Sequence, residues 1–68
     1  MPRVESSAIR AIDYDAVGRT LFVVFEDGDR YAYSDAPLEL FTAFLAAESK
    51  GRFFQTQVRG RFAYRRLA

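Results

Sequence analysis

The chain has 68 residues, of which 50% are apolar and 16% aromatic, and it carries a net charge of +1 with no cysteine and no histidine. This length predicts one domain, and the composition is too apolar for a disordered segment and too interrupted by charge for a membrane span. Without cysteine or histidine, disulfides, thiolate metal sites and histidine-based catalysis are excluded, and no metal or other cofactor is expected.

The N-terminal residues show no hydrophobic periodicity. Residues 1–7 include Pro2 and a pair of serines, so we expect a flexible arm there and a single domain over 8–68. The arm has no apolar run of signal-peptide length, which favours a cytoplasmic protein.

The first half of the domain predicts an antiparallel sheet. β-branched and aromatic residues dominate two stretches separated by a loop that ends in Gly18, a residue that can take a positive φ. Asp27-Gly28 predicts a two-residue hairpin turn into a further strand. The predicted three-stranded meander spans 8–14, 20–26 and 30–34.

The two-residue turn also predicts which side chains share a face of this sheet. It pairs Val24 with Tyr31 and Phe22 with Tyr33, so these four residues would lie on one face. The opposite face would then carry Leu21, Val23, Phe25 and Ala32. Because the middle strand is apolar on both faces, each face is either covered by the fold or left for a partner.

A helix is predicted over 36–48. Ser34 or Asp35 is placed to cap it, Pro37 suits its first turn, and no breaker interrupts it. Its apolar arc, which would pack on the sheet, consists of Leu38, Leu40, Phe41, Phe44, Leu45 and Ala47. Glu48 falls inside this arc, where an unpaired carboxylate is costly, so we expect an arginine partner for it.

A second, short helix is predicted over 50–57, with Ser49 as its cap. Gly51 and Gly60 are expected to take positive φ at a helix end and at a turn. Alternation of period two then predicts an extended segment over 61–66.

The charges are distributed unevenly along the chain. All nine acidic residues lie between Glu5 and Glu48, and no acid follows. The basic residues beyond that point are Lys50, Arg52, Arg59, Arg61, Arg65 and Arg66. Within the extended segment, Phe62 and Tyr64 are expected to face inward and the neighbouring Arg61 and Arg65 outward. The C-terminal quarter is therefore predicted to form a cationic ribbon.

The order and spacing of several short motifs resemble those of the KTSC domain family. The motifs are Ser6-Ser7 before a strand, Tyr31-Ala32-Tyr33, Pro37, Ser49-Lys50-Gly51-Arg52-Phe53-Phe54, Val58-Arg59-Gly60 and Tyr64. The resemblance runs from about Val4 to Leu67, with Gln55 where many relatives carry asparagine. That family is named for its occurrence at the C-terminus of some lysyl-tRNA synthetases and also occurs as free-standing bacterial proteins. The resemblance implies an α+β domain and a role in RNA binding.

Two groups of residues are candidate binding sites. Tyr31 and Tyr33 point from one face of a strand, where such aromatics stack on unpaired bases in several modules, although we favour a core position for them. The second group comprises Arg52, Arg59, Arg61, Arg65 and Arg66. These arginines would bind phosphates, or they would form a structural edge paired with the acidic front half.

No pattern in the sequence predicts catalysis. The chain contains neither a P-loop nor a dinucleotide-binding fingerprint, and Ser49 beside Lys50 in sequence does not make a catalytic dyad. We therefore expect a non-catalytic module that binds RNA or another nucleic acid through its basic C-terminal segment. The alternative is a protein-interaction module or a homodimer that uses an apolar sheet face or a strand edge. A third alternative is an enzyme subunit whose site a partner completes.

Overall fold

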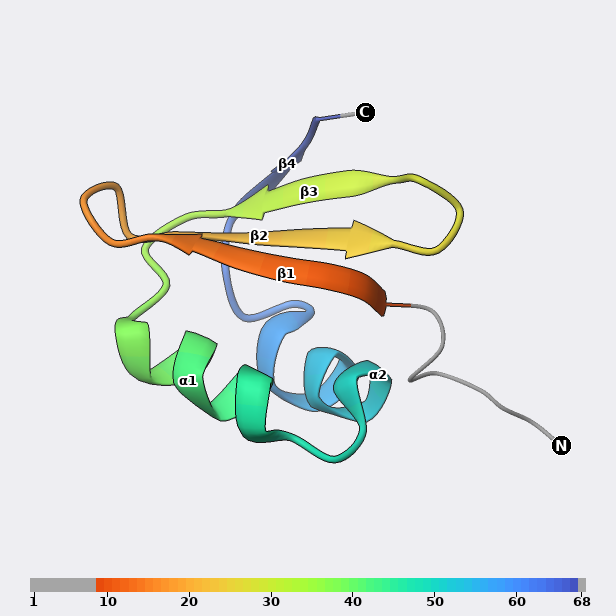
Figure 1. Ribbon diagram of the computed structural model, residues 1–68. Coiled ribbons are helices and arrows are strands. Elements are labelled where there is room, and N and C mark those ends of the chain that lie inside the picture. Colours follow the sequence, from red (N-terminus) through yellow and green to blue (C-terminus); the bar gives the residue numbers. More distant parts are fainter. Residues whose placement is uncertain (1–8, 68) are drawn as a thin grey trace, which may run out of the picture.

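The fold is a four-stranded antiparallel sheet with its helices on one side, as Figure 1 shows for the computed structural model, which describes residues 9–67. The strands, in both chain and spatial order, are β1 (Ile9–Asp15), β2 (Thr20–Phe25), β3 (Arg30–Tyr33) and β4 (Tyr64–Arg66). The helical elements are α1 (Leu38–Ala46), α2 (Lys50–Phe53) and the π-helical turn η2 (Phe54–Val58). The predicted α+β class and meander are confirmed, and the C-terminal extended segment adds a fourth strand. The predicted arm over 1–7 lies outside the described residues.

The turn between β2 and β3 differs from the predicted one by one residue. The amide of Phe25 donates to the carbonyl of Asp29, and the amide of Gly28 donates to the carbonyl of Phe25, both at 2.9 Å. Gly28 has φ +97°, so the connection is a three-residue loop in which a glycine follows a tight turn. The predicted register is therefore wrong, because Val23 pairs with Tyr31.

This shift of one residue exchanges the predicted faces of β3. Tyr31 and Tyr33 share the helix side of the sheet with Leu21 and Val23, and Ala32 lies on the other side opposite Phe22. The observed arrangement places large side chains together under the helices. Figure 1 shows no helix on the opposite side, which we call the open side.

The loop between β1 and β2 contains a glycine because a side chain would not fit there, and not because the residue has a positive φ. Arg19, not Gly18, takes the left-handed conformation, with φ 52°. A Cβ added to Gly18 would lie 2.8 Å from the Oδ2 of Asp15. Gly18 does not use the positive φ that glycine permits, and it is required instead by the close approach of the Asp15 side chain.

Helix α1 is shorter than predicted at both ends. Asp35 takes a left-handed φ of 57°, and the N-cap position falls on Pro37 with no side-chain hydrogen bond, so neither Ser34 nor Asp35 caps the helix. At the other end, Ala47 is already extended. Glu48 thus lies beyond the helix and is exposed, and it forms no ion pair with any described arginine, contrary to the prediction.

The second helical segment confirms the predicted short helix and its cap. The Oγ of Ser49 accepts a hydrogen bond from the amide of Arg52 at 3.2 Å. Gly51 lies inside α2 and is buried, so the predicted positive φ at that residue is wrong, whereas Gly60 has the predicted positive φ, at 77°. The amide of Arg59 donates to the carbonyl of Phe54 at 2.8 Å, which closes the wider π-helical turn.

The core lies between the helices and the helix side of the sheet. Its largest fully buried side chains are Phe44, Leu21, Val23 and Val58. The Phe44 ring stacks on Phe53 at 4.8 Å between centroids. The predicted apolar arc of α1 is only partly buried, since Leu38 and Leu45 remain more than half exposed. No helix among residues 9–67 is long and apolar enough to cross a membrane.

Candidate functional site

An open hollow of about 540 Å³ lies on the helix side of the sheet, against β3 and β4. Its surface is mainly apolar and is formed by five aromatic rings, from Phe25, Tyr31, Tyr33, Phe54 and Tyr64. Neighbouring rings lie between 5.3 and 6.4 Å apart, centroid to centroid. Such spacings are typical of aromatic rings that pack against one another. We refer to this surface below simply as the hollow.

Strand register brings the three tyrosines of the hollow together. Tyr31 and Tyr33 alternate along β3 and therefore point to the same side, and Tyr64 of β4 pairs directly with Tyr33. The centroid of the Tyr64 ring lies 5.7 Å from that of Tyr31 and 5.6 Å from that of Tyr33. Tyr64 is nevertheless 62% exposed, so its ring is available to a ligand.

Tyr33 is the most deeply placed tyrosine of the hollow. It is only 4% exposed, and its hydroxyl forms no hydrogen bond with any group in residues 9–67. Burial raises the pKa of Tyr33 to about 12, with smaller contributions from Tyr31 and Tyr64 that outweigh the opposing effect of the Arg59 guanidinium. The hydroxyl therefore stays protonated at neutral pH and offers an unused hydrogen-bond donor at the hollow.

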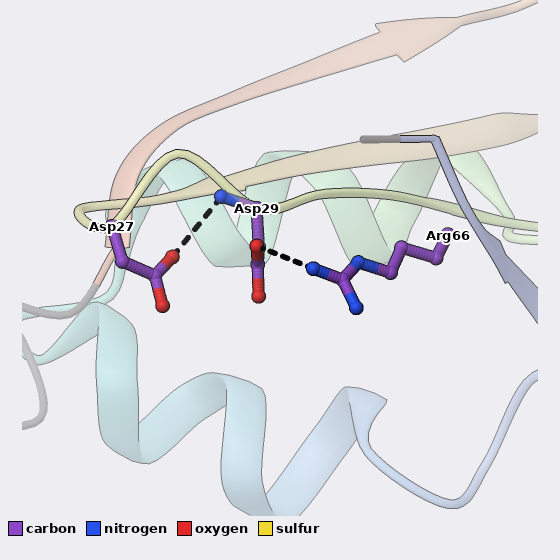
Figure 2. Close-up of polar contacts among 3 residues, drawn as sticks. All are labelled: Asp27, Asp29 and Arg66. Atoms are coloured by element: carbon purple, nitrogen blue, oxygen red, sulfur yellow. Dashed lines mark hydrogen bonds and ion pairs between the residues drawn. The ribbon is translucent and has the colours of Figure 1, made fainter.

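Acidic groups form the end of the hollow at the β2–β3 turn. Glu26, Asp27 and Asp29 all line it. Figure 2 shows the Asp27 and Asp29 side chains on the side of the sheet that faces the helices. The Oδ1 of Asp27 accepts from the Asp29 amide at 3.0 Å, and the Arg66 guanidinium donates to the Oδ1 of Asp29 at 2.9 Å. No group of three or more acidic side chains within residues 9–67 is arranged to hold a metal ion.

A basic group lines the hollow near Tyr33, at the end of β3 away from that turn. Arg59 is held there by its position directly after η2, and its Nη1 donates to the Oε1 of Gln55 at 3.0 Å. Gly60 follows with its positive φ and directs the chain toward β4. The hollow therefore has an acidic end and a basic end, with the aromatic rings between them.

The predicted arginines do not form one ribbon. Arg59 lines the hollow, and Arg66 binds one of the residues that line it. The Nε of Arg61 donates to the carbonyl of Thr56 at 3.0 Å. Arg65 pairs with Ala32 and lies on the open side of the sheet, and Arg52 lines a separate shallow depression beside Phe53. The predicted cationic segment is thus divided among several surfaces of the domain.

The two predicted tyrosines both belong to the hollow, but they differ in exposure. Tyr33 is buried, as the core interpretation expected, whereas Tyr31 is half-buried. Sequence reasoning did not identify Phe25, Phe54 or Tyr64 as parts of this site. The pairing of β4 with β3 brings Tyr64 there, and the alternation of residues 61–66 was its only sequence signal.

Comparisons with known proteins place this architecture in a family. The sequence model of the KTSC domain matches residues 5–62. A protein from Tsukamurella paurometabola is 47% identical over 62 residues, which cover 91% of this chain and 92% of that protein. A lysine–tRNA ligase from Nostoc sp. is 34% identical over 64 residues, which cover 94% of this chain but 11% of the ligase.

A solved structure agrees with the sequence comparisons. The crystal structure of a KTSC domain protein from Yersinia pestis superposes with a TM-score of 0.86 at 38% sequence identity, covering 98% of this chain and 94% of that one. The agreement extends over the sheet and the helices together. This chain therefore belongs to the KTSC domain family.

Proposed function

We propose that this protein is a small RNA-binding module that holds a single-stranded segment in the hollow. The observation that carries this proposal is the hollow itself, in which exposed and half-exposed rings lie beside an arginine and above an unpaired buried hydroxyl. Concave, mainly apolar surfaces with a few polar groups are the usual form of a ligand site.

Base stacking is the expected source of affinity. Tyr64 presents an exposed ring next to Tyr31, and unpaired bases stack on such rings in modules that bind single strands. Each stacked base contributes about 1–3 kcal/mol when measured by alanine substitution. The remaining rings keep the Tyr64 ring in place through their packing.

Phosphate contact is assigned to Arg59. It lines the hollow, it is exposed, and its charge is not neutralised by any acidic side chain in residues 9–67. A guanidinium that bonds only to the neutral amide of Gln55 keeps donors for a phosphate. Exposed Arg61, two residues further on, adds positive charge to the same segment.

The relatives favour RNA over other polyanions. Two relatives are named lysine–tRNA ligases, from Nostoc sp. and Trichormus variabilis, and segments similar to this chain make up 11% of each. An enzyme of that name acts on a tRNA, and a domain shared with it supports RNA as the ligand.

The test is the affinity for a labelled single-stranded oligoribonucleotide, measured by fluorescence anisotropy at several salt concentrations. We expect Tyr64→Ala to weaken binding about tenfold, as the loss of one stacking platform. Arg59→Ala should weaken binding and reduce the slope of log affinity against log salt by about 0.7.

The matched control is Arg65→Ala, which removes the same charge from the open side of the sheet. It should leave the affinity nearly unchanged. Equal losses for Arg59→Ala and Arg65→Ala, or no effect of Tyr64→Ala, would show that the hollow is not where RNA binds.

The open side of the sheet favours a second candidate function, self-association. One row across it consists of Asp13, Phe22, Ala32 and Arg65, from β1 to β4, so acid and base lie at opposite edges of an apolar centre. If a second copy packs face to face with its two-fold axis parallel to the strands, Asp13 of each copy lies over Arg65 of the other. Sedimentation that depends on protein concentration, and that Phe22→Glu abolishes, would support this candidate, whereas a monomer at all concentrations would exclude it.

A further inference from the structure

The charged groups of the hollow give a bound nucleotide a direction, an inference that rests on the proposed function. Phosphate is attracted to Arg59 and repelled by the carboxylates at the β2–β3 turn. Arg59 lies near Tyr33, and Asp29 precedes the other end of β3. A nucleotide with its phosphate at Arg59 and its base over the tyrosines therefore directs the far edge of that base toward the turn.

The carboxylates at the turn offer acceptors that the fold does not use. Among the described residues, Glu26 makes no hydrogen bond or ion pair, and Asp27 uses Oδ1 alone, for the Asp29 amide. Asp29 already accepts from Arg66. The base edge thus meets free acceptors from Glu26 and from the Oδ2 of Asp27, which bind N–H donors and repel carbonyl oxygens.

A second, independent observation points to a ligand at the same place. The hydroxyl of Tyr33 is buried at the hollow, stays protonated and has no partner in residues 9–67. Buried polar groups without a partner are rare in proteins, and a ligand acceptor would satisfy this one. The complementary ligand therefore presents an acceptor toward Tyr33 and donors toward the turn.

We propose that the hollow selects nucleobases that carry an exocyclic amino group and discriminates against uracil, with Glu26 and Asp27 as the specificity-determining residues. Cytosine offers its amino group to the carboxylates and keeps ring acceptors for the Tyr33 hydroxyl. Uracil presents a carbonyl oxygen where cytosine has that amino group, so the carboxylates repel it.

The test compares the affinities of oligocytidylate and oligouridylate of equal length, because both are pyrimidine strands with the same phosphate charge. We expect the wild-type protein to bind oligocytidylate about tenfold more tightly, the discrimination expected from one well-formed base contact. The double variant Glu26→Gln, Asp27→Asn should bring the ratio of the two affinities close to one. Its removal of negative charge raises both affinities together, so the ratio reports recognition rather than overall charge.

The outcomes separate this inference from the proposed function. If both strands bind equally and Tyr64→Ala weakens both, RNA occupies the hollow but the proposed selectivity is wrong. If Tyr64→Ala changes neither affinity, the proposed function itself fails. A ratio that the double variant leaves unchanged would show that the preference arises elsewhere, which also overturns the inference.

Discussion

The helix side of the sheet consists of two regions that differ in how they are covered. Against β1 and β2, Leu21 and Val23 are fully buried beneath Phe44 and Val58. Against β3 and β4, the rings of Tyr31 and Tyr64 border an open hollow. The first region is a packed core, and the second keeps a concave aromatic surface in contact with solvent.

The choice of side chains explains how one small sheet sustains both regions. Aliphatic residues gain stability only when they are covered, and Leu21 and Val23 on the helix side of β2 are covered completely. Tyrosine rings pack on one another and, at Tyr33, on Phe54 of η2, and they still tolerate water at their hydroxyls. The β3–β4 region therefore keeps its shape while the hollow stays open. The aromatic residues of this chain are therefore divided between the core and the site.

The largest effect is expected from a substitution in the packed region. Phe44→Ala removes a fully buried ring that stacks on Phe53, at a cost of about 3–5 kcal/mol, which is comparable to the whole stability of so small a domain. Urea unfolding should show a largely unfolded protein. The adjacent Leu45→Ala, on an exposed position, should change the free energy of unfolding by no more than about 0.5 kcal/mol. Similar losses for the two variants would contradict the assignment of the core.

The second prediction compares the hydroxyls of two tyrosines, Tyr33 and Tyr14, of which only the second has a hydrogen-bond partner in residues 9–67. Tyr33→Phe removes a hydroxyl without a partner and should stabilise the free protein by about 1 kcal/mol while weakening RNA binding. Tyr14→Phe should destabilise the protein by about 1 kcal/mol, because the Tyr14 hydroxyl donates to the Ala36 carbonyl at 2.6 Å. Thermal unfolding should therefore show a more stable protein for Tyr33→Phe and a less stable one for Tyr14→Phe. A destabilised Tyr33→Phe would mean that its hydroxyl has a partner in the free protein.

The pH dependence of stability gives a third test of the same residue. The pKa of Tyr33 is about 12 in the folded protein against an ordinary value of 10.0, so unfolding releases a proton between these limits. Its contribution to stability is therefore complete below pH 10 and is lost as the pH rises through 12. Denaturant unfolding across this range should show a steeper loss for the wild type than for Tyr33→Phe. Parallel pH profiles would contradict a buried hydroxyl.

The smallest effect is expected at the edge of the hollow. The ion pair between Asp29 and Arg66 is largely exposed, so Asp29→Asn should change the free energy of unfolding by about 0–1 kcal/mol. Added salt should reduce the difference from the wild type further, because the pair is screened. A larger loss, unaffected by salt, would show that this pair holds β3 and β4 together.

Much of the fold could be predicted from local sequence patterns, whereas the site depends on the register between strands. The strands, the Ser49 cap and the second helical segment follow from short signals and agree with the structure. The β2–β3 turn differs from its prediction, because Asp27-Gly28 suits both a two-residue turn and a three-residue loop with glycine at its end. That single residue of difference decides which face carries Tyr31 and Tyr33.

The charged segment was predictable in composition but not in arrangement. The positive φ of Gly60 and the short pairing of β4 with β3 direct successive arginines to different surfaces. Arg59 and Arg65 therefore lie on different surfaces, although a single cationic ribbon was predicted for the C-terminal segment. No local pattern encodes this separation, since it depends on where residues far apart in the chain pair.

Titration of a short single-stranded RNA into isotope-labelled protein, followed by amide chemical shifts, would show which surface of the domain binds RNA. We expect the shifts to concentrate around the hollow, on Phe25, Tyr31, Arg59, Gly60 and Tyr64. Shifts centred instead on Phe22 and Arg65, on the open side of the sheet, or no shifts at all, would contradict this expectation.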